Sequence, residues 1–560
     1  MPAAELRSLG LPFAGLGEGR EQRTVFGASV AASSLTKAIL RHSTCDRLVL
    51  IPPGGQEKSA ENEMKRWGVS EAADPRRFLF ARPEEWGSRA TSPGPCTLLH
   101  LRNRFFPAPA PVTFIHYTVS YANMLGELFL PLVLADTYPC DSIFCTSRDS
   151  RQAVQNLLDR ASEHIRERTG VERRFQGRLD LVPLGVDTDL FRPRDKRELR
   201  RQLELPLDAL VLLWVGRLSA ADKMDLLPLL RVFRDLVRER PDRNLFLVLG
   251  GGGERHNYSA LLSDAAQALG IADRVRIFPN FASNIRHLLF AASDVFVSPC
   301  DNPQETFGLT PIEAMACGVP QVVADWDGYK DTVVQGETGF LVPTWWTRCD
   351  SDLNAFAPFH AWEQDHLALA QSVVVDLEAL HRDLATLIDN DALREEMGRK
   401  SRERALSHYA WPVVIAGCEA VWNELESVAR STPFMPGRPS GVMTPGYFDD
   451  FGAYASATLP GTTVVTLTPS GKAALGGKEQ LPLFPYHEGL LDRELFQRIL
   501  VAMKTAALFR RPSRLDGLAE GLAEGDPFRA DQVRRHVLWL LKQGFLRLES
   551  PPPVSREPIR

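Results

Sequence analysis

Short apolar runs alternate with longer amphipathic stretches through most of this 560-residue chain. Short apolar runs bounded by turn residues are typical of buried parallel strands, and apolar residues three and four apart are typical of helices. The apolar runs of the first part are Arg47–Ile51, Thr97–Leu101, Val112–His116, Ser142–Thr146 and Leu179–Pro183. Helical stretches, such as Ser34–His42 and Arg151–Arg168, lie between several of them. This order predicts a parallel α/β sheet.

The same alternation restarts after Pro193. The expected strands are Leu210–Gly216, Asn244–Gly250, Val275–Phe278, Val295–Ser298 and Gln321–Ala324. The expected helices are Leu226–Arg238, Tyr258–Leu269 and Thr310–Cys317. A single core stops growing at about 250–300 residues, so this length requires more than one domain. Two successive α/β units predict two Rossmann-like domains that face a cleft, with ligands at the carboxyl ends of the strands.

The two ends of the chain differ from this α/β pattern. Residues 1–22 are rich in glycine and are expected to form a flexible arm. Residues 429–489 are rich in Pro, Gly, Ser and Thr and are expected to form a linker or loose wrap, with one strand pair near Thr462–Leu467. The last part has expected helices at Asp492–Thr505, Leu515–Leu522 and Asp531–Gln543 and a strand at Gly544–Leu548. This order predicts a winged-helix-like module over residues 490–550.

Composition narrows the protein class. Hydrophobic residues make up 44% and the formal charge is −5, which is ordinary for a globular protein and argues against non-specific nucleic-acid binding by the whole chain. The eight cysteines have no metal-site spacing, and we expect reduced core thiols. Neither a signal-peptide core nor an apolar run long enough for a transmembrane helix is present. We expect a cytoplasmic protein, and peripheral association with the inner face of a membrane stays open.

The segment Glu305–Pro320 (ETFGLTPIEAMACGVP) contains the densest candidate chemistry. Glu305 follows an expected strand, and Pro311 marks the first turn of a helix. The helix start offers backbone N–H groups and a favourable dipole to a diphosphate, and Gly308 lets the backbone approach it closely. A carboxylate at Glu313, expected in the first helical turn, suits the vicinal hydroxyls of a ribose. The alternative is that Glu305 and Glu313 are two solvated glutamates that flank a helix start.

Two cations follow the expected strand Leu210–Gly216, at the strand end where ligands bind. Arg217 and Lys223 could there neutralise the charge of a leaving diphosphate. No DxD-type metal site appears among the apolar strands, so we expect a metal-independent site. The alternative is a strand-end arginine and a helix-start lysine in water.

Together these stretches resemble the retaining glycosyltransferases of family 4, which have the GT-B fold. The resemblance covers about residues 23–428 and is most specific in the second domain. The matching segments are 216–223 (GRLSAADK), 247–254 (LVLGGGGE), 275–282 (VRIFPNFA), 294–324 and 336–343 (GETGFLVP). The separation of Glu305 and Glu313 is the paired-glutamate motif of that family.

The resemblance implies a role for each matching residue. Arg217 and Lys223 would bind the diphosphate, and Glu305 would hold hydroxyls of the donor sugar. Glu313 would bind the ribose, and His116 in the FIHYT segment would reach the donor sugar. Arg217, Lys223, Glu305 and His116 form the expected catalytic set. The other implied donor-binding residues are Gly27, Gly216, Phe278, Asn280, Phe307, Gly308, Leu309 and Thr310.

The resemblance also implies domain boundaries. Residues 182–193 look like the interdomain connection, and Tyr409–Trp411 looks like the start of the closing helix. The implied units are an N-terminal acceptor domain at 23–193, a donor domain at 194–410 and a closing helix at 411–428 that completes the first domain.

Three positions depart from the family pattern. The paired glycines of the first loop are reduced to Gly27, Met224 follows Lys223 where glycine is common, and Asp327–Gly328 replaces two glycines. These departures put the first-loop phosphate contacts and the acceptor contacts in doubt.

The stretch Thr344–Trp362 interrupts the α/β pattern with large aromatic residues among polar ones. These aromatics are Trp345, Trp346, Phe356, Phe359 and Trp362. The stretch is either a loop packed on the surface or a platform on which the apolar face of a sugar or other acceptor stacks.

The predicted activity is transfer of a sugar, of the hexosyl type, from a nucleoside-diphosphate sugar to an unidentified acceptor. A UDP-sugar is favoured over GDP- and ADP-sugars, no resident cofactor is expected, and the resemblance implies retention of configuration. One alternative is a phosphorylase or epimerase on the same fold. The other is a winged-helix regulator or partner-binding protein that senses nucleotide sugar.

The acceptor class stays open between a glycan, a lipid, a small molecule and a protein or peptide. Several arginines give the C-terminal module a basic character. They are Arg510, Arg511, Arg514, Arg529, Arg534 and Arg535. Acidic residues are interspersed among them, so protein contact or dimerisation is favoured over nucleic-acid binding.

Overall fold

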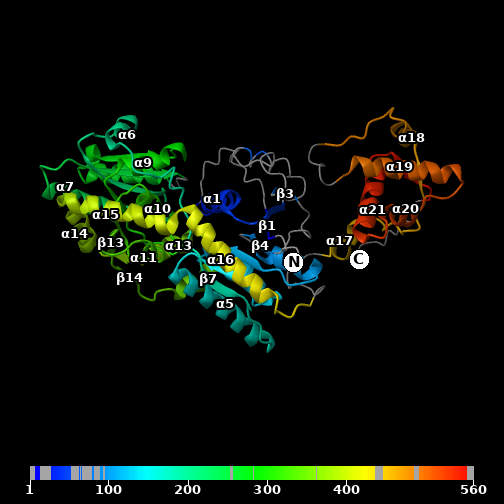
Figure 1. Ribbon diagram of the computed structural model, residues 1–560, viewed down its shortest axis with the longest axis horizontal. Coiled ribbons are helices and arrows are strands. Elements are labelled where there is room, and N and C mark those ends of the chain that lie inside the picture. Colours follow the sequence, from blue (N-terminus) through cyan, green and yellow to red (C-terminus); the bar gives the residue numbers. More distant parts are fainter. Residues whose placement is uncertain are drawn as a thin grey trace, which may run out of the picture. The chain divides into compact units, whose positions relative to one another are not determined.

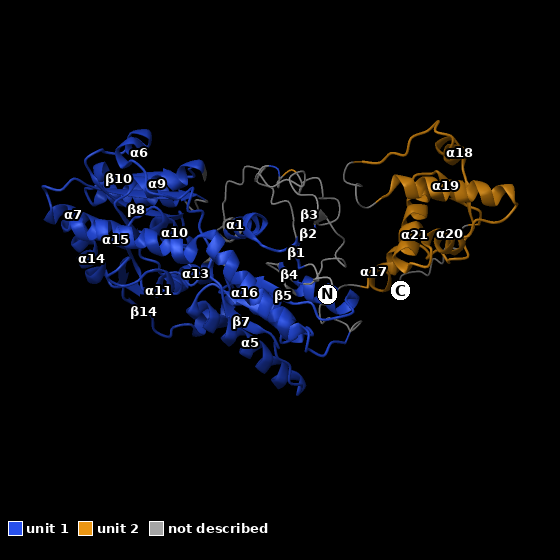
Figure 2. Cartoon of the chain, viewed as in Figure 1, with its two compact units in different colours: residues 1–51, 63–442 blue, residues 52–62, 443–560 orange. Residues whose placement is uncertain are grey.

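The computed structural model describes residues 7–12, 27–51, 62, 65, 78–80, 89–92, 95–252, 257–281, 283–360, 362–435, 446–484 and 491–550. The chain divides into two compact units (Figure 2). Unit 1 comprises residues 1–51 and 63–442, and unit 2 comprises residues 52–62 and 443–560. No helix among these described residues is long and apolar enough to cross a membrane.

A seven-stranded parallel sheet forms the first half of unit 1, in the order β3-β2-β1-β4-β5-β6-β7 (Figure 1). Its strands are β1 (Ser8–Pro12), β2 (Arg47–Ile51), β3 (Phe78–Phe80), β4 (Arg89–Ser92), β5 (Val112–Ile115), β6 (Ser142–Cys145) and β7 (Arg178–Leu181). Its helices include α1 (Gly27–His42), α3 (Pro95–Phe105), α4 (Leu130–Leu134) and α5 (Arg148–Thr169). Helix α5 begins at a capping box of Ser147 and Ser150 and ends at Gly170, whose φ of 70° suits glycine.

Two expectations are wrong in this sheet. The flexible arm expected over 1–22 is wrong at β1, which lies inside the sheet between β2 and β4 with Leu9 and Leu11 buried; residues 1–6 and 13–22 lie outside the described residues. The expected strand Thr97–Leu101 is instead part of α3, in which Leu98, Leu99 and Arg102 are buried at helical spacing. Short apolar runs do not distinguish a strand from a buried helix segment.

A six-stranded parallel sheet forms the second half of unit 1, in the order β10-β9-β8-β11-β12-β13. Its strands are β8 (Leu210–Arg217), β9 (Leu245–Gly252), β10 (Val275–Pro279), β11 (Val295–Ser298), β12 (Gln321–Ala324) and β13 (Gly339–Val342). Its helices include α7 (Leu227–Glu239), α8 (Tyr258–Ala268), α9 (Arg286–Ala292), α10 (Leu309–Ala316), α14 (Leu377–Asp389) and α15 (Asp391–Arg404). Each strand expected after Pro193 is confirmed. Two Rossmann-like sheets in one unit are the architecture of the GT-B fold.

Helix α16 (Trp411–Ala429) runs from the second half of unit 1 back to the first (Figure 1). Its first residue packs on the connection between the halves, because a Cβ on Gly185 would lie 2.5 Å from the Trp411 ring. Further along, the Glu419 carboxylate accepts a 2.8 Å hydrogen bond from the Ser43 hydroxyl, and the buried Trp422 indole donates to Thr113. The far end of α16 is therefore part of the N-terminal domain.

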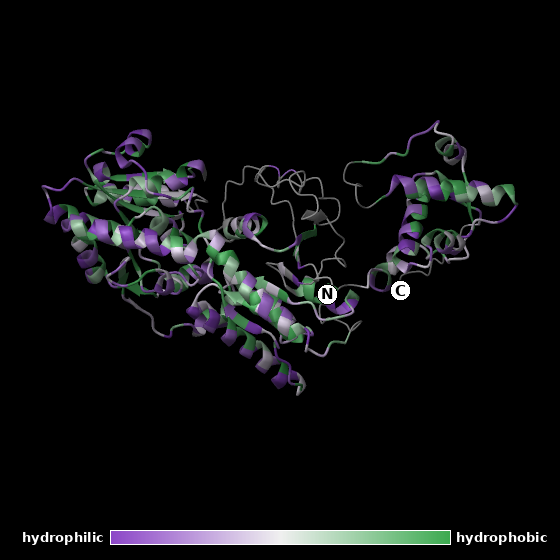
Figure 3. Ribbon diagram, viewed as in Figure 1, coloured by the Kyte–Doolittle hydropathy of each residue, from purple (hydrophilic) through white to green (hydrophobic). Residues whose placement is uncertain are grey.

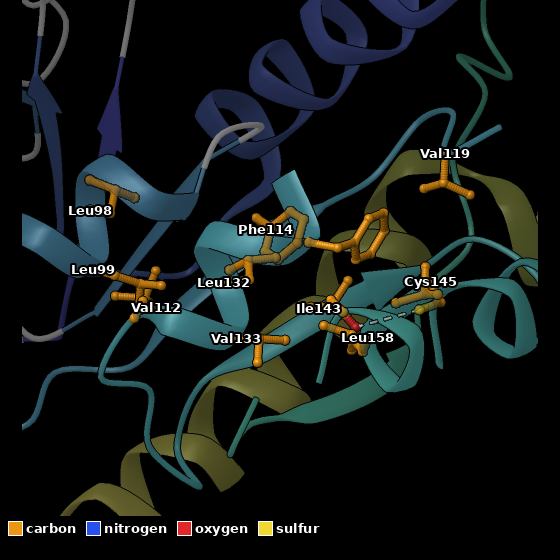
Figure 4. Packing of buried hydrophobic residues seen from close by; sticks show 14 of the residues in the cluster. Leu98, Leu99, Val112, Phe114, Val119, Leu132, Val133, Ile143, Cys145 and Leu158 are labelled. Carbon is orange, nitrogen blue, oxygen red and sulfur yellow. Dashed lines mark hydrogen bonds between the residues drawn. The ribbon is translucent and has the colours of Figure 1, made fainter. Parts of the chain in front are cut away.

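The core of the first sheet joins strands and helices that are distant in sequence. Phe114 of β5, Ile143 of β6 and Leu132 of α4 pack together, and Leu158 of α5 closes one side (Figure 4). The Cys145 thiol lies in this core and donates to the Ile143 carbonyl at 3.8 Å, and burial raises its pKa to about 12. Hydrophilic and hydrophobic residues alternate along the helices of unit 1 (Figure 3), as is typical of helices that cover a sheet on one side.

Unit 2 has its own core. Helices α19 (Arg493–Leu508), α20 (Leu515–Ala523) and α21 (Pro527–Lys542) pack around buried residues such as Phe496 and Val537. Strand β16 (Val465–Leu467) pairs antiparallel with β17 (Leu546–Leu548), and α18 (Pro469–Leu475) follows β16. The expected linker over 429–489 is therefore wrong at α18, which belongs to this core. Strand β16 lies where a strand pair was expected near Thr462–Leu467, but its partner is β17, from the other end of the unit.

The aromatic insertion (residues 344–375) is folded. It begins with β14 (Thr344–Trp345), which pairs antiparallel with β15 (Val374–Val375). Between these strands lie α12 (Ser351–Phe356), the 3-10 turn η5 (Ala357–Phe359) and α13 (Trp362–Ala370). The pairing of β14 with β15 thus joins the first and last residues of the insertion.

Candidate active site

The order of strands in the second sheet brings the main candidate residues together. The chain runs outward from β8 through β9 to β10 and then returns to β11, on the other side of β8. Ligands bind to open α/β sheets in the crevice at such a reversal. Lys223 follows β8 and Glu305 follows β11, and the Lys223 Nζ donates to the Glu305 Oε2 at 2.5 Å. The structure thus brings two residues that were expected to hold different parts of the donor into direct contact.

Both members of the pair are charged in the ligand-free protein. Burial opposes ionisation of Glu305, but the Lys223 charge and the backbone N–H groups of Phe307 and Gly308 outweigh it, and the pKa of Glu305 is lowered. Burial likewise opposes the charge on Lys223, but Glu305 outweighs it and raises the lysine pKa. The side chains are only 16% and 14% exposed, so each charge depends on the other.

The second expected cation is also paired. Arg217 ends β8, is buried, and donates to the Asp222 carboxylate within the same loop. The loop is held in place from β11, because the Asn302 side-chain amide donates to the Ala221 carbonyl at 2.9 Å. A Cβ on Gly216 would lie 3.1 Å from the Lys223 side chain, so this glycine supports the lysine closely. An arriving anion would therefore have to share or replace Asp222 and Glu305 as partners of these cations.

The turn after Glu305 has a tightly determined backbone. Gly308 has a φ of 94° and precedes α10, whose N-terminus has no side-chain cap. A Cβ on Gly308 would lie 2.4 Å from the Tyr329 ring, and one on Gly328 would lie 2.3 Å from the Phe307 Cα. Leu309 and Thr310 are the first two residues of α10. The start of α10 therefore has no side-chain cap, and the backbone on either side of it is closely packed against Tyr329 and Phe307.

Glu313 lies in the second turn of α10, not in the first as expected. It is buried, and its Oε2 accepts two hydrogen bonds from Arg286, at 2.7 Å and 3.0 Å. Burial raises the pKa of Glu313, and the Arg286 charge opposes that shift. One oxygen of this carboxylate is thus held by a guanidinium.

His116 follows β5 in the N-terminal domain. The loops after β5 and β6 of this domain contact the loop that carries Glu305. The Thr306 hydroxyl donates to the Tyr117 carbonyl, and the Thr146 hydroxyl donates to the Thr306 carbonyl at 3.0 Å. His116 is 4% exposed, and neither ring nitrogen has a hydrogen-bond partner among the described residues. Burial lowers its pKa to about 4, so the ring is neutral at pH 7.

Three expected donor-binding residues lie on elements other than those that carry Lys223 and Glu305. Phe278 and Asn280 are at the end of β10, which is separated from β8 by β9. Asn280 is exposed and has a φ of 51°, and the Arg276 guanidinium lies 5.2 Å from the Phe278 ring centre. Gly27 begins α1 in the first half of unit 1.

Several partners of the site were missed from the sequence. Asp222 lies inside the matching segment 216–223 but was given no role there, and Arg286 lies outside every matching segment; both pair with expected residues. Asp327 was noted only as a departure from a glycine. Its Oδ1 accepts a 2.6 Å hydrogen bond from the Ser147 hydroxyl, so it joins the two domains. Burial raises the pKa of Asp327 to about 7, and the hydrogen bond from Ser147 opposes that shift.

One family model matches part of the second half of unit 1. Residues 195–347 match the family model described as glycosyl transferases group 1. This group 1 match contains Arg217, Lys223, Glu305 and Glu313, and it ends within the first residues of the aromatic insertion.

Curated proteins of similar sequence are named glycosyltransferases. The chain is 36% identical over 227 residues to a D-inositol 3-phosphate glycosyltransferase of Thermobispora bispora, covering 37% of this chain and 52% of the relative. It is 37% identical over 196 residues to the protein of the same name in Mycobacteroides abscessus, covering 35% of this chain and 42% of the relative. The chain thus spans about half the length of the curated relatives that it matches.

Among solved structures, sucrose-phosphate synthase from Thermosynechococcus elongatus has a TM-score of 0.48 and 16% sequence identity, over 75% of this chain and 99% of that one. A glycosyltransferase from Rickettsia africae has a TM-score of 0.46 and 15% identity, over 75% of this chain and 98% of that one.

Proposed function

We propose that this protein transfers a sugar from a nucleoside-diphosphate sugar to an acceptor hydroxyl, with retention of configuration and with UDP as the favoured nucleotide. One observation carries the proposal. The strand reversal of the second sheet brings a largely buried lysine, an arginine and a glutamate close to a helix start that has no side-chain cap. The resemblance to family 4 supports retention and the preference for UDP.

The ion pairs suggest how donor binding would rearrange the site. The diphosphate would take over Lys223 and Arg217 as partners and would approach the start of α10. Glu305, released from Lys223, would accept hydrogen bonds from hydroxyls of the donor sugar. Neutral His116 would offer a ring nitrogen to the same sugar. Glu313, held by Arg286 on one oxygen, would bind the ribose.

The transfer itself would need no enzymic nucleophile. The bond between the anomeric carbon and the diphosphate oxygen breaks as the acceptor oxygen bonds to the same face of that carbon. The acceptor proton passes to the leaving diphosphate oxygen. Arg217, Lys223 and the helix start stabilise the charge that grows on the diphosphate.

Two assays test this proposal. Thermal-shift titration with UDP, GDP and ADP should show stabilisation, strongest with UDP, and the corresponding sugar nucleotide should be hydrolysed slowly without an acceptor. Activity should survive EDTA, since the expected site uses cations of the chain in place of a metal. Lack of binding by every nucleotide, or loss of activity with EDTA and recovery with a divalent metal, would contradict the proposal. Dependence on orthophosphate would favour the phosphorylase alternative.

The names of the curated relatives suggest a first acceptor to test. Because those proteins are named for D-inositol 3-phosphate, we propose this cyclitol phosphate as the first acceptor in a transfer assay. Product formation, detected by mass spectrometry as the added sugar mass, would support it.

For unit 2 we propose a winged-helix-like module that binds a protein partner or a second copy. Its basic residues are partly neutralised: Arg534 pairs with Asp516 and Asp531, and Arg529 pairs with Glu524. Such pairing weakens the attraction for a phosphate backbone. Mobility-shift assays with duplex DNA at low and physiological salt test the nucleic-acid alternative, which tight binding at physiological salt would favour.

A further inference from the structure

A cavity of about 520 Å³ lies between the loop after β5, in the first half of unit 1, and the aromatic insertion. Its residues include Ser120 from the loop after β5 and, from the insertion, Trp346, Cys349, Asp350, Asn354 and Asp365. A volume in this range is typical of small-ligand sites. The proposed donor residues line none of it.

The wall of this cavity is fixed to the loop that carries Glu305. The Ser120 hydroxyl and the His366 Nε2 lie 3.1 Å apart, within hydrogen-bond distance, and the Tyr121 ring lies 4.2 Å from the His366 ring. The Tyr121 hydroxyl donates to the Gln304 side chain at 3.1 Å, one residue before Glu305. His366 is 1% exposed, and its Nδ1 has no hydrogen-bond partner among the described residues. The residues beside the cavity wall are therefore joined, through Tyr121 and Gln304, to the loop that carries Glu305.

Trp346 presents a fixed and accessible aromatic face. Its indole N–H donates to the Ser372 hydroxyl at 2.8 Å, and its ring lies 5.6 Å from the ring of Trp326. Trp326 in turn donates to the Asn302 carbonyl at 3.1 Å, in the loop after β11. Despite these contacts Trp346 stays 49% exposed. A ring held by its edge with an open surface is suited to stack on a ligand.

The polar groups around Trp346 favour a particular ligand class. Asp350, Asp365 and Asn354 offer carboxylate and amide groups, which form hydrogen bonds with hydroxyls. The carboxylates also outnumber the single cation of the lining, Arg348, which is itself paired with Asp350 at 3.3 Å. A phosphate would meet more like charge than opposite charge there. An aromatic ring beside hydroxyl-binding groups instead suits a neutral carbohydrate.

We propose that this cavity is the acceptor site and that it takes a neutral sugar or glycoside. The proposal rests on the proposed function, because an acceptor site presupposes sugar transfer. It assigns acceptor recognition to the aromatic insertion, most of which lies beyond residue 347, where the group 1 match ends. It also predicts that a neutral acceptor binds better than D-inositol 3-phosphate.

Cys349 provides a direct test of binding in the full-length protein. Of the eight cysteines it alone is exposed, and it lines the cavity. Its alkylation by iodoacetamide, followed by peptide mass spectrometry, should slow at least threefold in 50 mM maltose or lactose with UDP present, and little in D-inositol 3-phosphate. The Trp346→Ala variant should lose this protection. Phe359→Ala is the matched control, because this aromatic of the same insertion is 88% exposed and does not line the cavity.

Transfer kinetics give the second arm. With either disaccharide as acceptor, Trp346→Ala should raise the acceptor KM at least tenfold and leave the KM of the donor and its slow hydrolysis unchanged. Phe359→Ala should match the parent in both. Intact UDP binding and donor hydrolysis, without protection or transfer to a neutral sugar, would overturn the acceptor-site proposal alone. Absence of UDP binding and donor hydrolysis would overturn the proposed function itself.

Discussion

The Lys223–Glu305 pair allows the proposed site to be tested as a free energy. The two atoms lie 2.5 Å apart, and the side chains are 16% and 14% exposed. Removal of one partner of a buried ion pair costs about 3–5 kcal/mol, because the other charge stays buried without a partner. Lys223→Met leaves Glu305 with the Phe307 and Gly308 N–H groups, so we expect a cost near the lower limit, about 3 kcal/mol.

The double variant should recover most of this loss. Lys223→Met together with Glu305→Gln leaves no unpaired buried charge, so the cycle should give a coupling free energy of about 2–3 kcal/mol. Urea denaturation at pH 7 of the parent, the two single variants and the double variant measures it. The exposed pair Arg399–Glu403 on α15 provides the control cycle, in which we expect much weaker coupling.

Nucleotide binding by the same proteins separates the two roles. UDP should stabilise the parent and Glu305→Gln in a thermal-shift assay, because the diphosphate cations remain, but should not stabilise Lys223→Met. Glu305→Gln should lose turnover, since it lacks the carboxylate for the donor sugar. A coupling below about 0.5 kcal/mol, the error of additivity for independent sites, would refute the buried-pair reasoning. Equal UDP binding by Lys223→Met and the parent would remove this lysine from the diphosphate site.

Three further predictions concern the surroundings of the site. Gly328→Ala should lower the stability of the protein in urea and weaken UDP binding, because the new Cβ would lie 2.3 Å from the Phe307 backbone. Gly417→Ala on α16 is the control, because its new Cβ would have no atom within 4 Å, and it should change neither property. Because burial raises the pKa of Asp327 to about 7, its ionisation costs the folded protein stability as pH rises from about 4 to 7. Asp327→Asn should therefore raise Tm at pH 8 and have little effect on Tm at pH 4. Equal shifts of Tm at both pH values would contradict this reasoning. A chain that ends at residue 442 should fold and bind UDP. If it no longer transfers sugar to the acceptor, or no longer dimerises, the lost activity belongs to unit 2. A truncated chain that folds but does not bind UDP would show that unit 2 contributes to donor binding.

The sequence alone determined the features that depend on local patterns. The strands after Pro193 were predictable because each apolar run is buried on both faces of a parallel sheet and therefore reads as a continuous hydrophobic segment. The closeness of Lys223 and Glu305 could also be inferred from the sequence. Both residues follow strands of one α/β unit, and the carboxyl ends of parallel strands lie at the same edge of the sheet. The start of α10 was marked by Pro311.

The tertiary structure decided what depends on partners distant in the chain. Strand β1 exists because β2 and β4 pair with a short Gly- and Leu-containing segment, and β16 exists because β17 pairs with it from the other end of unit 2. Arg286 became part of the site only when α9 packed beside α10. The cavity of the aromatic insertion likewise needs Ser120 from the first half of unit 1. Hydrogen bonds and burial between residues far apart in sequence leave no local period, so only the folded chain reveals them.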